Sequence, residues 1–285
     1  MDAGGSHRGG AGEPLVLIHG FSATRDAWKP VLSRLEGSFD VLAVTLAGHV
    51  GGAQIAAGTP VSVEALIDAV EAEMDSAGIQ SAHLVGNSLG GWIALALAQR
   101  GRARSVVALS PAGGWEAASR AEARLRRLFT RNHKISTRLL PHAERLMRRP
   151  RLRRALLAQA MARGDRLDAA SAVQLIRDAV ACPVYFELME AILSDGPPAS
   201  FEGISCPVLL AWGTRDRILP ARRYSQRLRE LLGAAEWLEL QGLGHVPMAD
   251  DPELIARTIV EFAERSQALP ADSPGSGAIL ASSGS

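Results

Sequence analysis

Cysteine and long apolar runs are scarce in this 285-residue chain, and each shortage excludes a class of protein. The two cysteines, Cys182 and Cys206, are too few for a disulfide framework or a cysteine metal site. Two free thiols in a reducing compartment are expected rather than one disulfide. No apolar run approaches the ~20 residues that cross a bilayer, and residues 1–12 hold no apolar targeting segment. We therefore expect a cytoplasmic protein.

An excess of positive or of negative charge is also lacking. The 31 basic and 30 acidic residues leave a net charge of +1, which argues against a protein devoted to nucleic acid. Lysine occurs only at Lys29 and Lys134, and the heavy use of arginine and alanine indicates GC-rich coding sequence rather than function. With 47% hydrophobic residues, the chain has enough apolar material for one large domain or one domain with an insertion.

Short apolar segments alternate with longer amphipathic ones along most of the chain. Strands are expected at 15–18, 41–44, 83–85, 105–109, 208–212 and 236–240, and helices at 25–35, 62–77, 89–100, 221–232 and from 251 onward. Thr24, Ser62 and Asp251 are the expected N-caps, and Gly78 is an expected C-cap. This alternation predicts an α/β fold, with a mostly parallel sheet flanked by helices. Residues 1–12 and 266–285 are predicted to be disordered tails.

One interval, residues 113–203, breaks the alternation. It has no convincing strand, and prolines interrupt its amphipathic helical stretches. Between residues 114 and 164, thirteen arginines and Lys134 outweigh three glutamates for a net charge of +11, which leaves −10 for the remainder. We predict a helical lid over 113–203, inserted between two parts of one core, 13–112 and 204–265. A solvated basic face is the simpler interpretation of its charge; the alternative is attraction to an anionic substrate or a membrane surface.

The most informative stretch is Gly86-Asn87-Ser88-Leu89-Gly90-Gly91. It joins an expected strand directly to an expected helix, and its glycines let the two backbones approach closely. This G-x-S-x-G spacing is that of a nucleophile elbow, which holds a serine hydroxyl at the apex of a tight turn. Such a serine needs a base and an orienting carboxylate. Asp216 follows one later strand and His245 follows the next, in the order Ser88, Asp216, His245 that this fold requires.

Four motifs together resemble the α/β-hydrolase fold superfamily, and in particular a lid-bearing serine hydrolase of the esterase or lipase kind. They are His19-Gly20-Phe21 after the first strand, the elbow, the loop with Gly213 and Asp216, and Gly244-His245. The resemblance runs from about residue 14 to 265. It implies an oxyanion hole made by the backbone N–H groups of Phe21 and Leu89. The loop 45–52 departs from the family's usual Pro-Gly-His-Gly-x-Ser pattern but keeps Gly48 and His49.

The resulting hypothesis is a serine hydrolase that cleaves an ester or related acyl bond of a mainly hydrophobic small molecule through an acyl-enzyme, without metal or cofactor. Alternatives are a carbon–carbon bond hydrolase of ring-cleavage diketo acids, a cofactor-free haloperoxidase or perhydrolase, and a non-catalytic binding protein of the same fold. Against the carbon–carbon alternative, Val246 stands where those enzymes usually carry tryptophan. Haloalkane dehalogenases and epoxide hydrolases are disfavoured because they use aspartate at the elbow.

Other polar residues have structural interpretations. His19 is expected to bond loop backbone rather than to catalyse. Asp195, Asp250 or Asp251 could replace Asp216 as the acid, but Asp251 is better explained as an N-cap, and Asp250 is close to His245 in sequence.

Overall fold

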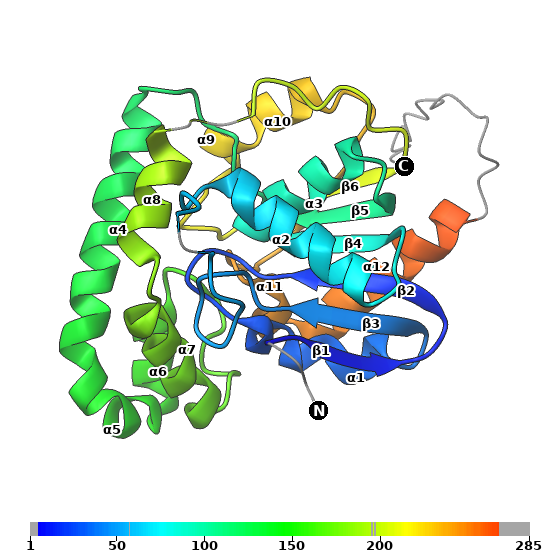
Figure 1. The fold of residues 1–285 in the computed structure, drawn as a ribbon. Coiled ribbons are helices and arrows are strands. Elements are labelled where there is room, and N and C mark those ends of the chain that lie inside the picture. The colour runs from blue at the N-terminus through cyan, green and yellow to red at the C-terminus, as the bar shows by residue number, and fades with distance from the viewer. Residues whose placement is uncertain (1–4, 57, 195, 197, 268–285) are drawn as a thin grey trace, which may run out of the picture.

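Seven strands form a single sheet in the order β1-β3-β2-β4-β5-β6-β7, in a computed structural model that describes residues 5–56, 58–194, 196 and 198–267 (Figure 1). All neighbouring strands are parallel except β1, which runs antiparallel to β3. The strands are β1 (His7–Gly10), β2 (Glu13–Ile18), β3 (Phe39–Val44), β4 (Ala82–Asn87), β5 (Ala103–Leu109), β6 (Val208–Gly213) and β7 (Glu236–Leu240). The six strands expected from the sequence are thereby confirmed, each within two residues at either end.

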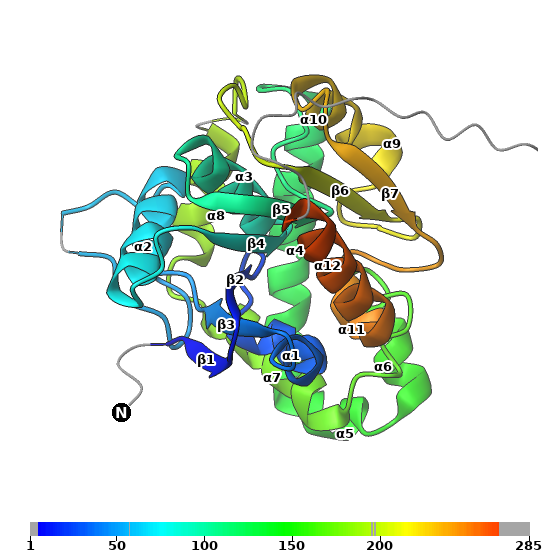
Figure 2. The ribbon, with the colours of Figure 1, turned by 90° about the vertical axis from the view of Figure 1, so that its right-hand side faces the viewer.

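Helices cover both faces of the sheet (Figure 2). Helices α1 and α12 pack on one face, while α2, α3 and α10 pack on the other. Outside the insertion the helices are η1 (Arg25–Trp28), α1 (Lys29–Leu35), α2 (Val63–Ser76), α3 (Leu89–Gln99), α9 (Ala221–Tyr224), α10 (Gln226–Leu231), α11 (Pro247–Asp250) and α12 (Pro252–Gln267). The expected caps form: Thr24 and Ser62 accept from backbone N–H groups, Asp251 accepts from Leu254, and Gly78 ends α2 at a φ of 74°.

Strand β1 corrects the prediction of a disordered segment over residues 1–12. Its sequence, His7-Arg8-Gly9-Gly10, holds no apolar side chain, so hydrophobic patterning could not reveal it. Backbone pairing with β3 and two polar contacts hold it instead, from His7 to Glu36 at 2.5 Å and from Arg8 to Asp40 at 2.6 Å. At the other end, residues 266 and 267 belong to α12, and the remainder of the predicted tail, 268–285, lies outside the described residues.

Between β5 and β6 the chain leaves the sheet and forms a helical insertion, which stands at the carboxyl ends of the parallel strands (Figure 1). Its helices are α4 (Arg120–Leu139), η2 (Leu140–His142), α5 (Ala143–Met147), α6 (Pro150–Leu157), α7 (Ala169–Ala181) and α8 (Tyr185–Ser194). Helices α5 to α7 share a small core with Ala249, whereas α8 joins the main core. The insertion is therefore anchored at two separate places.

The strand order locates the crevice where a ligand is expected. The chain passes from β2 outward to β3 and then returns to β4 on the other side of β2. In open parallel sheets, ligands bind outside the carboxyl ends of the strands at such a switch point. The loops that leave β2 and β4, which carry Phe21 and Ser88, flank that position.

Both cysteines are free, as expected, and burial raises the pKa of each thiol to about 11. Among the described residues, no helix is both long and apolar enough to cross a bilayer.

Candidate active site

Ser88 occupies the sharp turn between β4 and α3. Its backbone has φ 56° and ψ −116°, a combination that few residues other than glycine adopt. The turn is held by backbone bonds on both sides: Ser88 N–H donates to Leu109 at 3.0 Å, and Ser88 C=O accepts from Ala112 at 2.9 Å. Strain that the surroundings impose in this way is characteristic of functional sites.

The elbow glycines are required by close backbone contacts. A Cβ at Gly86 would lie 2.0 Å from the carbonyl oxygen of Gly90, and a Cβ at Gly90 would lie 2.1 Å from that of Ile18. Because these contacts involve backbone on both sides, no side chain can move away to make room. The sequence spacing therefore reflects a real packing requirement.

Asp216 and His245 meet in a buried pair. Asp216 Oδ2 lies 2.7 Å from His245 Nδ1, and Asp216 Oδ1 accepts from the N–H groups of Ile218 and Leu219 at 2.9 and 2.8 Å. Burial by itself would raise the pKa of Asp216, but the attraction to His245 and these hydrogen bonds hold that pKa below its usual value. An ionised Asp216 fixes the imidazole with Nδ1–H toward the carboxylate and leaves Nε2 available as a base.

Asn87 connects Ser88 to this pair. Its side-chain amide donates to the carbonyl of His245 at 2.9 Å and to that of Leu109 at 3.0 Å. Within the described residues, Ser88 and His245 share no direct hydrogen bond. In the sequence, Asn87 is recognisable only as part of the elbow motif. Its contact with His245, which lies 158 residues away in the chain, leaves no signal in the neighbouring residues.

The two amides expected in the oxyanion hole have no protein partner in the part of the chain that the structure describes. Leu89 N–H is at the first turn of α3, where the helix dipole favours negative charge. Phe21 belongs to the loop after β2, and both residues line the same cavity as Ser88. Free amides beside a serine hydroxyl can stabilise a developing oxyanion.

His19 and His49 fix the course of the Phe21 loop. His19 Nε2 accepts from Leu46 N–H at 3.0 Å, so Nδ1 carries the proton and donates to the Gly20 carbonyl at 2.7 Å. His49 in turn accepts from Ser22 N–H at 3.3 Å. Burial, together with repulsion from His49, lowers the pKa of His19 to about 3. Its contacts agree with the structural interpretation of His19.

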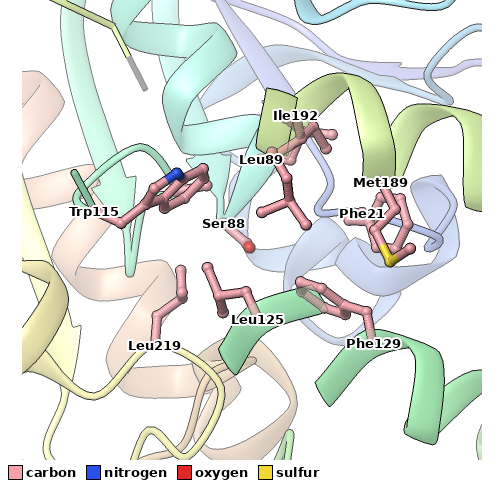
Figure 3. A pocket seen from close by; sticks show the side chains of 11 residues that line it. Phe21, Ser88, Leu89, Trp115, Leu125, Phe129, Met189, Ile192 and Leu219 are labelled. Carbon is pink, nitrogen blue, oxygen red and sulfur yellow. The ribbon is translucent and has the colours of Figure 1, made fainter. Parts of the chain in front are cut away.

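A small apolar cavity opens beside Ser88 (Figure 3). Eleven residues line it, and all of these described residues are uncharged: Phe21, Ser88, Leu89, Ala112, Trp115, Leu125, Phe129, Met189, Ile192, Leu193 and Leu219. Helices α4 and α8 of the insertion supply five of them. An uncharged lining of this kind is typical of sites that bind apolar small molecules.

Asp250, like Asn87, has a role that its sequence context did not indicate. It is fully buried and does not contact the ring of His245. Its carboxylate accepts from the N–H groups of Gly244 at 2.7 Å, Ala162 at 2.9 Å and Arg163 at 2.7 Å. Asp250 thus joins the loop of His245 to the helical insertion.

Comparison with known proteins gives consistent results. The sequence model described as "Alpha/beta hydrolase family" matches residues 15–258. The epoxide hydrolase EphH of Mycobacterium tuberculosis is 34% identical over 200 residues, which cover 70% of this chain and 94% of that protein. A 2-hydroxymuconate semialdehyde hydrolase of Pseudomonas is 38% identical over 112 residues, covering 38% of this chain and 39% of that protein. The crystal structure of a membrane phospholipase A has a TM-score of 0.72 at 26% identity, covering 92% of this chain and 82% of that one.

Proposed function

The chain belongs to the alpha/beta hydrolase family and is a hydrolase of that fold, and from this premise we propose that it cleaves an ester or related acyl bond through a serine nucleophile. The observation that carries the proposal is the strained Ser88 beside a cavity lined by Phe21 and Leu89, whose backbone N–H groups have no partner among the described residues, with His245 held by Asp216 at 2.7 Å. We assign Ser88, His245 and Asp216 as the catalytic triad, and Phe21 and Leu89 as the oxyanion hole.

In this mechanism Ser88 Oγ attacks the acyl carbon and His245 Nε2 takes up the hydroxyl proton. Asp216 stabilises the imidazolium that forms. The carbonyl oxygen becomes an oxyanion that accepts from the N–H groups of Phe21 and Leu89, an interaction worth about 2.7–4 kcal/mol for each donor. His245 then protonates the leaving group, and a water molecule activated by His245 hydrolyses the acyl-enzyme. Serine–base contacts that are open in a free enzyme commonly tighten when substrate binds.

The uncharged cavity favours a neutral, apolar acyl group. A diketo acid, the substrate class of the carbon–carbon alternative, would bring a carboxylate into a site that offers it no cationic side chain among the eleven lining residues. Burying an unpaired carboxylate is costly. The similarity to a semialdehyde hydrolase favours this alternative, but the uncharged lining of the cavity argues against it.

Epoxide hydrolysis is the second candidate, because a relative that is 34% identical over 70% of this chain bears that name. Ser88 argues against a covalent route: serine attack on an epoxide gives an ether, which water cannot hydrolyse, whereas an aspartate nucleophile gives an ester, which it can. Epoxide opening here would need water activated directly by His245. That route would not depend on the Ser88 hydroxyl.

The test is turnover of p-nitrophenyl esters, from acetyl to dodecanoyl, and of styrene oxide by the wild-type chain, Ser88→Ala and the control Ser76→Ala on the exposed side of α2. We expect ester hydrolysis to fall on the order of 10⁶-fold in Ser88→Ala only. A fluorophosphonate should label the wild-type protein at Ser88. The proposal would be refuted if the wild-type protein neither hydrolysed the esters nor reacted with the fluorophosphonate, while Ser88→Ala still formed the diol from styrene oxide. That result would favour epoxide hydrolysis by water.

A further inference from the structure

The outward side of α4 carries a row of five exposed cations. Arg124, Arg127, Arg131, Lys134 and Arg138 follow one another at intervals of three and four residues. At 3.6 residues per turn this spacing places them along one side of the helix, over a length of roughly 21 Å. Helix α4 forms the outer edge of the molecule in Figure 1. We call these five residues the α4 stripe.

The α4 stripe has no counter-ions. None of its five side chains takes part in an ion pair with any residue that the structure describes, whereas other cations of the molecule are paired. Arg100, for example, pairs with Glu64 and Glu71 of α2. Arg126, on another side of α4, pairs with Glu122 and Glu190. A surface built only for solubility mixes both signs, so a one-signed row points to an anionic partner.

The positive charge continues beyond the helix. Arg145, Arg148, Arg149 and Arg151 follow in and around α5 and α6, and they are also exposed and without an ion pair among the described residues. The rest of the chain, outside residues 114–164, has a net charge of −10. The positive charge is therefore concentrated in one segment, and an anionic surface would attract residues 114–164 and repel the rest of the chain.

Apolar side chains accompany these cations. Four large hydrophobic residues stand out as exposed among the described residues, and all four belong to the insertion: Ile135, Leu152, Leu156 and Phe186. Their exposed fractions lie between 36% and 47%. Basic side chains mixed with exposed large apolar ones are typical of segments that lie on a lipid interface, where phosphates meet acyl chains. Nucleic acid would satisfy the charge but not these apolar groups.

The opposite side of α4 lines the cavity above Ser88. Leu125 and Phe129, one turn apart, contribute to its wall (Figure 3). One helix thus separates the cavity from the α4 stripe. A protein resting on this side of α4 would bring the cavity next to the surface on which it rests.

We propose that the α4 stripe docks the protein peripherally on the anionic surface of a phospholipid bilayer, with the exposed apolar residues of the insertion reaching the interface. The inference goes beyond the proposed reaction and does not depend on it. On this proposal the basic side of α4 is a docking surface rather than a purely solvated face. Its partner has negatively charged phosphates at its surface and apolar acyl chains inside.

Co-sedimentation with vesicles tests the proposal directly. Wild-type protein is mixed with sucrose-loaded vesicles of pure phosphatidylcholine, or of phosphatidylcholine with about 30% phosphatidylglycerol, at low and at high salt. The stripe variant Arg127→Gln/Arg131→Gln/Arg138→Gln is compared with Arg34→Gln/Arg222→Gln/Arg257→Gln, which removes the same charge from exposed positions outside the insertion. Ser88→Ala serves to separate surface binding from occupation of the cavity.

We expect wild-type and Ser88→Ala proteins to bind the anionic vesicles, and to release them at high salt. Each basic residue near such a surface contributes about fivefold to binding, so the stripe variant should bind on the order of a hundredfold more weakly. The control triple should bind almost as wild type. Equal loss in both triples, no preference for anionic vesicles, or displacement from them by a short DNA duplex would overturn the proposal. Because Ser88→Ala retains the docking surface, failure here is distinguishable from failure of the proposed reaction.

Discussion

The side-chain amide of Asn87 donates a hydrogen bond of 2.9 Å to the backbone carbonyl of His245. Asn87 precedes Ser88 directly, so the turn that holds the candidate nucleophile also holds the loop of the candidate base. The contact spans 158 residues of sequence and is fully buried. A displacement of either loop is therefore expected to displace the other, because the side chain of Asn87 joins them.

Asn87→Ala should separate these loops. It leaves the carbonyl of His245 buried without its donor, whereas that of Leu109 keeps the N–H of Ser88, and the loss costs about 1–3 kcal/mol of unfolding free energy. We expect kcat for ester hydrolysis to fall at least tenfold with little change in KM, because the cavity wall is untouched. Urea unfolding and steady-state kinetics measure the two effects. Asn132→Ala on α4 is the control, and unchanged kcat in Asn87→Ala would contradict the linking role.

Asp250→Asn should disturb His245 through the backbone. The amide offers one acceptor oxygen where the carboxylate offers two, so at least one of the N–H groups of Gly244, Ala162 and Arg163 loses its partner. We expect a loss of about 1–3 kcal/mol in stability and a fall in kcat, with the acidic limb of the pH–rate profile displaced.

The matched control is Asp251→Asn. Asp251 caps α12 and has no bond to Gly244, so the substitution should cost about 1 kcal/mol of stability and leave the pH–rate profile in place. If both variants lose stability alike and neither changes the profile, Asp250 is purely structural.

His19 makes stability depend on pH. Its folded pKa is about 3, whereas its ordinary value is 6.5. Between these values the unfolded chain binds a proton that the folded chain does not, so the unfolding free energy falls as pH falls through this window. The contribution is about 1.4 kcal/mol per pH unit, and it is fully present above pH 6.5. His49, whose pKa burial also lowers, acts in the same direction.

Urea unfolding at pH 7.5, 6.5, 5.5 and 4.5 gives this slope. His19→Gln cannot titrate, so its stability should be lower at neutral pH but should fall less steeply with acid. His142→Gln, a change at an exposed histidine, should reproduce the wild-type slope. A His19→Gln slope equal to that of wild type would show that His19 is not the group responsible.

Phe129→Ala should enlarge the cavity between α4 and α8. The lost ring leaves room for additional methylene groups, each worth about 0.8 kcal/mol when buried. We expect kcat/KM to shift toward longer acyl chains in a series of p-nitrophenyl esters. Phe186→Ala removes the same ring from an exposed position on α8 outside the cavity, and its chain-length profile should match wild type.

Local patterns in the sequence predicted much of the fold and the candidate residues. Five of the six parallel strands are short runs largely buried on both faces, β7 at the edge being the exception, and the elbow, Asp216 and His245 each follow a strand end in a glycine-marked loop. Periodicity could not predict β1, because backbone pairing and polar contacts hold its four residues. It also indicated helices in the insertion without indicating which of their side chains would line the cavity.

The remaining contacts depend on tertiary structure alone. Asp250 meets Ala162, which is 88 residues away, and Asn87 meets His245 across almost twice that separation. Nothing in the neighbouring residues distinguishes these polar side chains from ordinary turn or cap residues. Their roles follow only from where the folded chain brings them.

The hydrogen bonds of Asp250 constrain how the cavity can open. They fix the segment after α6 to the loop of His245, while α4 and α8 contact the cavity through apolar side chains. Apolar contacts slide at lower cost than buried carboxylate bonds break. We therefore expect the entrance to widen by rearrangement of the apolar side chains of α4 and α8, while the bonds of Asp250 to Ala162 and Arg163 leave the geometry of the base unchanged as substrate enters.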